Sequence, residues 1–203
     1  MKILSTDLQK DFSAEDGKAY RPRQSVNFIR NTLIPFCHEQ NIKITEIISD
    51  YRQPRPGDTG DCCHPGEWGY ESEIPDDIRQ SKAWVKCMNS PIWVRENGGD
   101  SENAPGLPYQ DTHGFSEWLM TVVGSPEESE EVVLIGLTMD CCVLCTAQEL
   151  TFRGYRVYML YEGTDPYSGD DCEKEYLANH SPLTNWAEII TWKELSLKLR
   201  EHD

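Results

Sequence analysis

The sequence predicts an α/β fold in which helices cover both faces of a parallel β-sheet, giving a three-layer sandwich. Short apolar and β-branched runs alternate with segments of helical periodicity along the 203 residues. Such alternation is typical of parallel sheets, because each strand needs a crossover helix before the next. Hydrophobic residues make up 38% of the chain, enough for one core, and we expect a single domain over residues 1–203.

The first half of the chain contains three predicted strands and one long helix. Residues 3–6 form a short apolar run, and apolar side chains then recur at helical spacing over residues 22–40. Pro35 is expected to kink or end that helix early, because proline has no N–H to donate. Strands are expected at residues 42–48 and 83–86, separated by a loop rich in Pro, Gly and Asp.

Residues 95–113 interrupt this pattern. They contain three Gly and two Pro with scarcely any periodicity, which indicates an insertion, a lid or an oligomer contact. The alternation then resumes with a helix at 115–123, a strand at 132–137, a helix at 142–153, a strand at 155–161, a helix at 172–179, a strand at 187–191 and a helix at 192–200.

Composition excludes several classes of protein. The formal charge of −16 argues against a nucleic-acid or anionic-membrane surface, since both require clustered Lys and Arg. No run approaches the ~18 apolar residues of a membrane span, and no secretory signal begins the chain, so a cytoplasmic protein is expected. Eight Cys in a chain with its own core predict reduced thiols rather than a disulfide framework.

Reactive side chains stand where three predicted strands end. Asp7 follows the first strand, Lys86 closes the third, and Cys141, Cys142 and Cys145 follow the strand at 132–137. Because ligand crevices of parallel sheets lie at the carboxyl ends of the strands, we expect these groups to converge. The cysteines also open a predicted helix, whose N-terminal partial charge favours a thiolate.

This combination suits nucleophilic catalysis by a thiol. Asp7 is expected to accept the thiol proton and Lys86 to stabilise the thiolate, while backbone N–H groups around Thr138 and Cys142 form an oxyanion site. Adjacent helical positions point about 100° apart. Cys141 is therefore expected to pack in the interior and leave Cys142 in the crevice.

Two segments resemble a known family. Residues 7–12, DLQKDF, are similar to the D-x-Q-x-D-F opening of the isochorismatase-like cysteine hydrolases, which include nicotinamidases, N-carbamoylsarcosine amidohydrolases, ureidoacrylate hydrolases and biuret hydrolases. Residues 136–147, GLTMDCCVLCTA, resemble the family's G-x-x-T-D-x-C-V-x-x-T-A nucleophile turn, with Met139 in place of the usual Thr. Of a third family motif, K-x-x-x-S-A-F, this chain keeps only the Lys and the Ser, as Lys86 and Ser90. Lys82 and Arg95 are alternative positions for the lysine of this motif.

The resemblance implies a six-stranded parallel sheet and a catalytic triad of Asp7, Lys86 and Cys142. It further implies a cis peptide before Thr138, no organic cofactor, and a homodimer or homotetramer. The expected substrate is a small amide or ureido compound, cleaved at a C–N bond through a thioester acyl-enzyme. Phe12, Trp68 and Trp93 are the aromatic candidates for substrate binding.

Metal binding is a separate question, because nicotinamidases of this family bind a metal through D-x-H and further histidines. The corresponding Asp50-Tyr51-Arg52 has Arg in place of His. Asp50, Cys62, Cys63 and His64 include suitable zinc ligands, but loops of this composition usually bind nothing, and no metal is expected.

Two other functions stay open from the sequence. Because the K-x-x-x-S-A-F motif is incomplete, the chain is also consistent with a ligand-binding pseudoenzyme of the same fold. Cys142 and Cys145 form a C-x-x-C, which occurs in dithiol oxidoreductases. A regulatory disulfide between these two cysteines is a further possibility.

Overall fold

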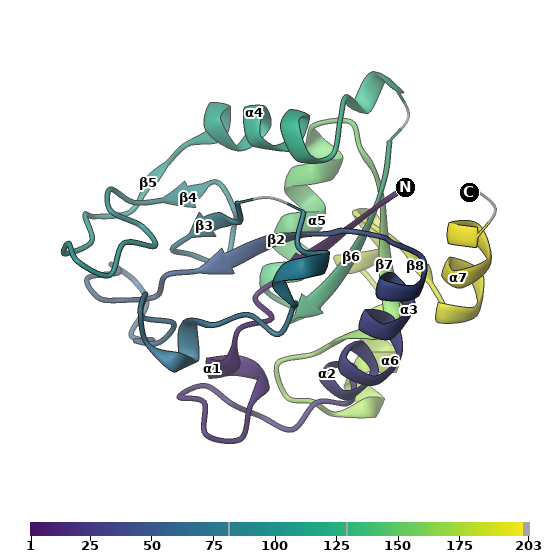
Figure 1. Cartoon of the computed structure of the whole chain (residues 1–203), viewed down its shortest axis with the longest axis horizontal. Helices are drawn as coiled ribbons and strands as arrows, with labels where there is room; N and C mark the ends of the chain where they lie inside the picture. The colour runs from purple at the N-terminus through teal and green to yellow at the C-terminus, as the bar shows by residue number, and fades with distance from the viewer. Residues whose placement is uncertain (81, 129, 201–203) are drawn as a thin grey trace.

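One six-stranded parallel sheet forms the centre of the computed structural model, which describes residues 1–80, 82–128 and 130–200 (Figure 1). Its strands are β1 (Lys2–Thr6), β2 (Ile44–Ser49), β3 (Trp84–Lys86), β6 (Glu131–Leu137), β7 (Arg156–Asp165) and β8 (Glu188–Ile190). Their order is β3-β2-β1-β6-β7-β8, and every neighbouring pair is parallel. The predicted α/β class and the six-stranded sheet are confirmed.

Two hydrophobic layers hold helices against the sheet. Leu4 and Leu134 pack on one face with α4 (Thr112–Val122) and α5 (Cys142–Phe152). Ile3 and Val133 pack on the other face with the helical segment from α2 (Gln24–Phe28) to α3 (Ile34–Glu39) and with α7 (Trp192–Arg200). Successive strand residues point to opposite faces, so each buried strand supplies both layers. Figure 1 shows α4 on the opposite side of the sheet from α2 and α3.

The remaining elements are short. They are α1 (Lys10–Ser13), α2 (Gln24–Phe28), η1 (Ile29–Leu33), α3 (Ile34–Glu39), η2 (Trp68–Tyr70), η3 (Asp76–Ile78), β4 (Trp93–Val94), β5 (Tyr109–Gln110), η4 (Pro126–Glu128), α6 (Asp171–Ala178) and η5 (Leu183–Asn185). Strands β4 and β5 form a separate antiparallel pair. None of the helices in the described ranges combines the length and the apolar character that crossing a bilayer requires.

The long helix of the first half does not end at Pro35. It begins at Gln24, contains the π turn η1, and continues as α3 to Glu39. In the π turn the Ile34 N–H bonds to the Ile29 carbonyl, five residues back. This wider turn stands directly before Pro35, where an α-helix would bring the proline ring against a carbonyl. Of the two expected effects of Pro35, a kink or an early end, the early end is excluded, because the helical segment continues to Glu39.

Two further boundaries differ from the prediction. The expected insertion at 95–113 contains β5 and the first turn of α4, which Asp111 caps by accepting from the Gly114 N–H at 2.8 Å. Strand β7 continues to Asp165, past the predicted end at residue 161, after a shift of register against β6. Tertiary pairing overrides the polar sequence there, and Asp165 comes to lie beside Leu137 at the end of β6.

Candidate active site

The segment that follows β1 is tied to neighbouring loops by buried polar side chains. Asp7 has a left-handed φ of 53°, and its N–H donates to a β2 carbonyl at 2.9 Å. The Gln9 side chain donates to the Ser49 carbonyl at 2.9 Å and accepts from the Ser49 N–H at 2.7 Å. Asp11 accepts from the Cys63 N–H at 2.6 Å. The D-x-Q-x-D pattern therefore holds the Asp7 carboxylate in place through its two polar neighbours.

Lys86 is a fully buried ammonium at the end of β3. Its Nζ donates to three oxygens and lies near one sulfur: Asp7 Oδ2 at 2.8 Å, Ser49 Oγ at 2.8 Å, Tyr51 OH at 2.6 Å and Cys142 Sγ at 3.5 Å. Burial alone would lower the pKa of Lys86, but the charge of the Asp7 carboxylate and its hydrogen bond with Lys86 raise it above its usual range. The group stays a cation, in contact with both other candidate residues.

The competing alignments for the lysine lie elsewhere. Lys82 is exposed. Arg95 is buried, and its guanidinium donates to the carbonyls of Arg52 and Pro54 at 2.8 and 3.2 Å. Of the three positions, Lys86 is the one that the structure brings to Asp7 and Cys142.

A tight approach of β1 and β6 shapes the turn before the nucleophile. Gly136 has a φ of 108°, and a Cβ at this position would lie 2.0 Å from the Thr6 carbonyl oxygen. Only glycine accepts both conditions. The Leu137–Thr138 peptide is cis, as the resemblance implies.

This turn leaves two backbone donors unused. Within the described chain, the N–H groups of Thr138 and Cys142 have no hydrogen-bond acceptor, whereas the N–H of Met139 donates to Asp165 and that of Cys141 donates to Thr138. Cys142 is the first residue of α5, where N–H groups lack partners in the helix. The two free donors are those that the sequence assigned to an oxyanion site.

The surroundings of Cys142 favour its neutral thiol in the free protein. Its neighbour Cys141 and burial raise the pKa of Cys142 well above its usual range, and Lys86 acts in the opposite direction. The same interaction lowers the pKa of Cys141, which lines the cavity and is only half-buried. A helix N-terminus by itself favours the thiolate, so the expectation from sequence was wrong here, because burial and a second thiol outweigh it.

Sequence reasoning missed Tyr51. Its buried hydroxyl lies 2.6 Å from Lys86 Nζ and 3.4 Å from Cys142 Sγ. An ammonium only donates, so Tyr51 accepts from Lys86 and its own proton remains for the sulfur. The Arg55 guanidinium stacks over the ring at 3.7 Å and fixes its plane. The available signal was position: Tyr51 stands two residues after β2, at the carboxyl end of the sheet.

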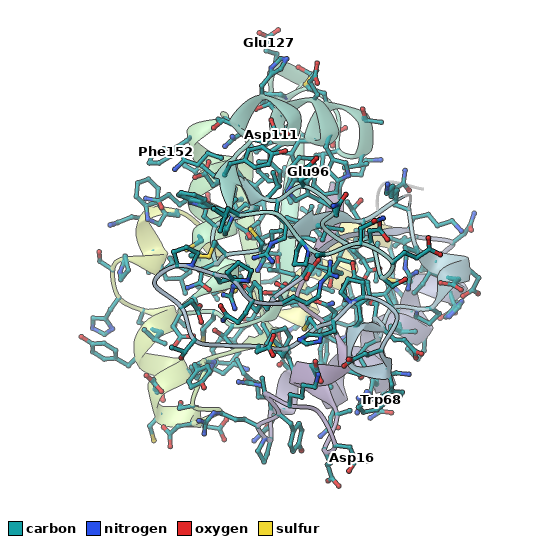
Figure 2. All side chains as sticks on the ribbon, turned by 90° about the vertical axis from the view of Figure 1, so that its left-hand side faces the viewer. Asp16, Trp68, Glu96, Asp111, Glu127 and Phe152 are labelled. Carbon is teal, nitrogen blue, oxygen red and sulfur yellow. The ribbon has the colours of Figure 1, made fainter. Side chains whose placement is uncertain are left out.

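These groups meet at a cavity of about 420 Å³. It is lined by Asp7, Phe12, Ala19, Arg23, Tyr51, Arg55, Asp58, Thr59, Gly60, Cys62, Asn89, Leu137, Thr138, Cys141, Cys142 and Tyr167. Phe12 is thus the aromatic candidate that the structure brings to the cavity. Trp68 is 44% exposed and lies at the periphery in Figure 2, and Trp93 pairs with β5 outside the cavity wall.

The four residues considered for zinc do not converge. Arg52 forms a two-pronged ion pair with Asp50, at 2.6 and 2.9 Å, and so takes up its carboxylate. His64 pairs with Asp61 at 2.7 Å. Cys62 and Cys63 gather instead around Asp11, whose carboxylate is already engaged by the Cys63 N–H.

Solved structures of similar architecture include several hydrolases. The isochorismatase-like hydrolase from Alkaliphilus metalliredigens has 18% identity and a TM-score of 0.63, over 100% of this chain and 98% of that chain. The pyrazinamidase of Pyrococcus horikoshii, in complex with zinc, has 15% identity and a TM-score of 0.63, over 94% and 98%. N-carbamoylsarcosine amidase from Thermoplasma acidophilum has 19% identity and a TM-score of 0.56, over 94% and 96%.

No protein-family model and no curated protein matches the sequence. The likeness to solved structures therefore lies in the arrangement of the chain, at identities below one residue in five. The superposition on the Alkaliphilus metalliredigens hydrolase covers nearly the whole of both chains. This chain has the fold of the isochorismatase-like hydrolases.

Proposed function

We propose that this chain is an isochorismatase-like amidohydrolase that cleaves a C–N bond of a small amide or ureido compound, with Cys142 as nucleophile. One observation carries the proposal: the buried Lys86 ammonium contacts both the Asp7 carboxylate and the Cys142 sulfur. A cation shared by an acid and a thiol in a cavity wall has a catalytic use. The solved structures of similar fold include a pyrazinamidase and an N-carbamoylsarcosine amidase, which supports an amide substrate.

Proton transfer starts the proposed reaction. The distances favour a relay through Lys86, because its Nζ contacts both Asp7 and Cys142. Lys86 gives one proton to Asp7 and takes the thiol proton, so Lys86 remains an ammonium while Asp7 becomes a neutral acid. Cys142 becomes a thiolate, held by Lys86 and by the Tyr51 hydroxyl.

The thiolate then attacks the carbonyl carbon of the substrate. A C–S bond forms, and the carbonyl oxygen takes the negative charge beside the free N–H groups of Thr138 and Cys142. When this intermediate collapses, the C–N bond breaks and the nitrogen leaves with the proton that Asp7 holds. Water then attacks the thioester carbon while Asp7 accepts a proton of that water. When the C–S bond breaks, the acid product leaves and the proton held by Asp7 returns through Lys86 to the Cys142 sulfur.

Ammonia release tests the proposal. The substrate panel is nicotinamide, N-carbamoyl amino acids, biuret and ureido acids. We expect release from at least one compound by the wild type and by Cys172→Ala, whose thiol is exposed on α6, and none by Cys142→Ala. Full activity in Cys142→Ala contradicts the triad. Tight binding without hydrolysis across the panel supports the pseudoenzyme.

A further inference from the structure

Arg23 and Arg55 line the proposed active-site cavity, and the fully buried Lys86 lies behind its wall in contact with Asp7 and Cys142. Two of these three cations have a carboxylate. Lys86 Nζ lies 2.8 Å from Asp7, and the Arg55 guanidinium lies 2.6 Å from Asp58. Arg23 differs: among residues 1–80, 82–128 and 130–200, no carboxylate oxygen lies within 4.0 Å of its guanidinium. The cavity therefore has one cation more than its own acids balance, in a protein whose formal charge is −16.

The contacts of Arg23 leave part of its guanidinium available. The residue is 7% exposed, and it donates to three carbonyls: from Nε to Pro166 at 3.3 Å, from Nη1 to Phe12 at 3.2 Å and from Nη2 to Tyr167 at 3.0 Å. A guanidinium has five N–H groups, so one remains on each terminal nitrogen. The three carbonyls hold the group in place without cancelling its charge.

Nearby acids are already engaged. Asp165 acts on Arg23 through its charge, but its two oxygens accept from Lys174 Nζ at 2.7 Å and from the Ser25 N–H at 2.7 Å. Burial lowers the pKa of Arg23, which shows that its charge is incompletely compensated. Buried charges are normally paired, but Arg23 forms no ion pair with a carboxylate of the described residues, and the charges of Asp165 and Asp140 act on it only from a distance.

We propose that Arg23 binds a carboxylate of the substrate, so that the compound hydrolysed at Cys142 carries an amide or ureido group at one end and a carboxylate at the other. This inference rests on the proposed function and narrows its substrate class. Both residues line the same cavity, whose volume of about 420 Å³ suits a small bifunctional molecule. The guanidinium offers paired donors that match a carboxylate.

Matched substrates test the inference. N-carbamoylglycine, N-carbamoyl-β-alanine and succinamic acid are each compared with their methyl esters, which keep the reacting group and lose the charge. In the wild type, kcat/KM for the acid is expected to exceed that for the ester by about tenfold or more, the effect of charge-assisted hydrogen bonds. Arg23→Gln is expected to remove this preference through KM, and Arg23→Lys to restore part of it.

Arg21→Gln is the control. Arg21 also lies against Tyr167, with its guanidinium 4.7 Å from the ring centre, but it is exposed and outside the cavity wall, so the acid preference is expected to remain. If Arg23 has only a structural role, Arg23→Gln should lower kcat/KM by the same factor for the acid and for its ester. That result, or equal rates for acid and ester in the wild type, overturns the inference and leaves Cys142-dependent hydrolysis intact.

Calorimetry separates this inference from the proposed function. If no compound is hydrolysed, binding of each acid and ester to the wild type and to Arg23→Gln is measured directly. Acids that bind about tenfold more tightly than esters, with the difference lost in Arg23→Gln, support the carboxylate site even though the proposed hydrolysis fails. Equal or undetectable binding of the acids contradicts it.

Discussion

Tyr51→Phe removes one hydroxyl from the site and nothing else. In the wild type the Lys86 ammonium has three N–H groups and four acceptors, which are Asp7, Ser49, Tyr51 and the Cys142 sulfur. After the substitution, the three N–H groups of Lys86 still have three acceptors, namely Asp7, Ser49 and the Cys142 sulfur. We therefore expect the free energy of unfolding to fall by no more than about 1 kcal/mol, the net value of one hydrogen bond.

The thiol is expected to respond more strongly than the fold. The Tyr51 hydroxyl lies 3.4 Å from Cys142 Sγ and donates to it, so its loss disfavours the thiolate. A hydrogen bond to a charged group is worth about 1.5–3 kcal/mol, so its loss raises the pKa of Cys142 further and lowers the thiolate population by about 13- to 160-fold. A more basic thiolate is also a better nucleophile, and this gain in reactivity offsets a little under half of the loss of thiolate on a logarithmic scale. Alkylation of Cys142 at fixed pH should then slow by roughly 4- to 16-fold.

The assay follows iodoacetamide labelling of Cys142 by peptide mass spectrometry from pH 6 to 10. Tyr155→Phe is the matched control, because its hydroxyl donates to the Gly124 carbonyl at 2.7 Å, outside the cavity wall. The labelling rate of that control should equal the wild-type rate at every pH. An unchanged rate in Tyr51→Phe, or a loss of stability well above 1 kcal/mol, refutes the assigned direction of the hydrogen bond.

Three further predictions concern the same region. Because the pKa of Cys142 is raised, its rate of iodoacetamide labelling should keep rising with pH through pH 9, and a plateau below pH 8 in the wild type contradicts the raised pKa. Cys141→Ala removes the largest cause of the raised pKa and should accelerate labelling of Cys142 at pH 7. Asp7→Asn leaves the Lys86 ammonium without its carboxylate, so it should abolish ammonia release. It should also lower the free energy of unfolding, measured in urea, by about 3–5 kcal/mol. A wild-type unfolding midpoint in this variant contradicts a stabilising role of the Lys86–Asp7 ion pair. Gly136→Ala places a methyl 2.0 Å from a carbonyl oxygen and should prevent stable folding, visible as a lost thermal transition.

Periodicity sufficed for the class of fold because a parallel sheet needs apolar strands alternating with amphipathic helices. It failed where tertiary contacts override local preference. Pro35 is accommodated by a π turn, and the polar end of β7 is held as a strand by pairing with β6. Neither contact follows from local residue order, so the sequence predicted neither the π turn before Pro35 nor the end of β7 at Asp165.

The candidate site divides in the same way. Asp7, Lys86 and Cys142 were predictable, because reactive side chains at the ends of parallel strands must meet at one edge of the sheet. Tyr51 carried the same positional signal and was overlooked. Arg23 was not predictable, since it follows no strand and reaches the cavity only through side-chain packing. Trp68, one of the three aromatic candidates, is 44% exposed and lies outside the cavity wall, because its position depends on how the loop around it folds.

The sequence by itself determined the order of strands and helices, the segments that hold reactive groups, and the glycine that permits the nucleophile turn. These properties depend on hydrophobic period and backbone freedom, which are local. Only the tertiary structure decided that burial and Cys141 raise the pKa of Cys142, that Lys86 contacts Ser49 and Tyr51 as well as Asp7 and Cys142, and that Arg23 lacks a carboxylate partner among the described residues. Charge and proton affinity depend on burial and on neighbours distant in sequence, and folding alone sets these.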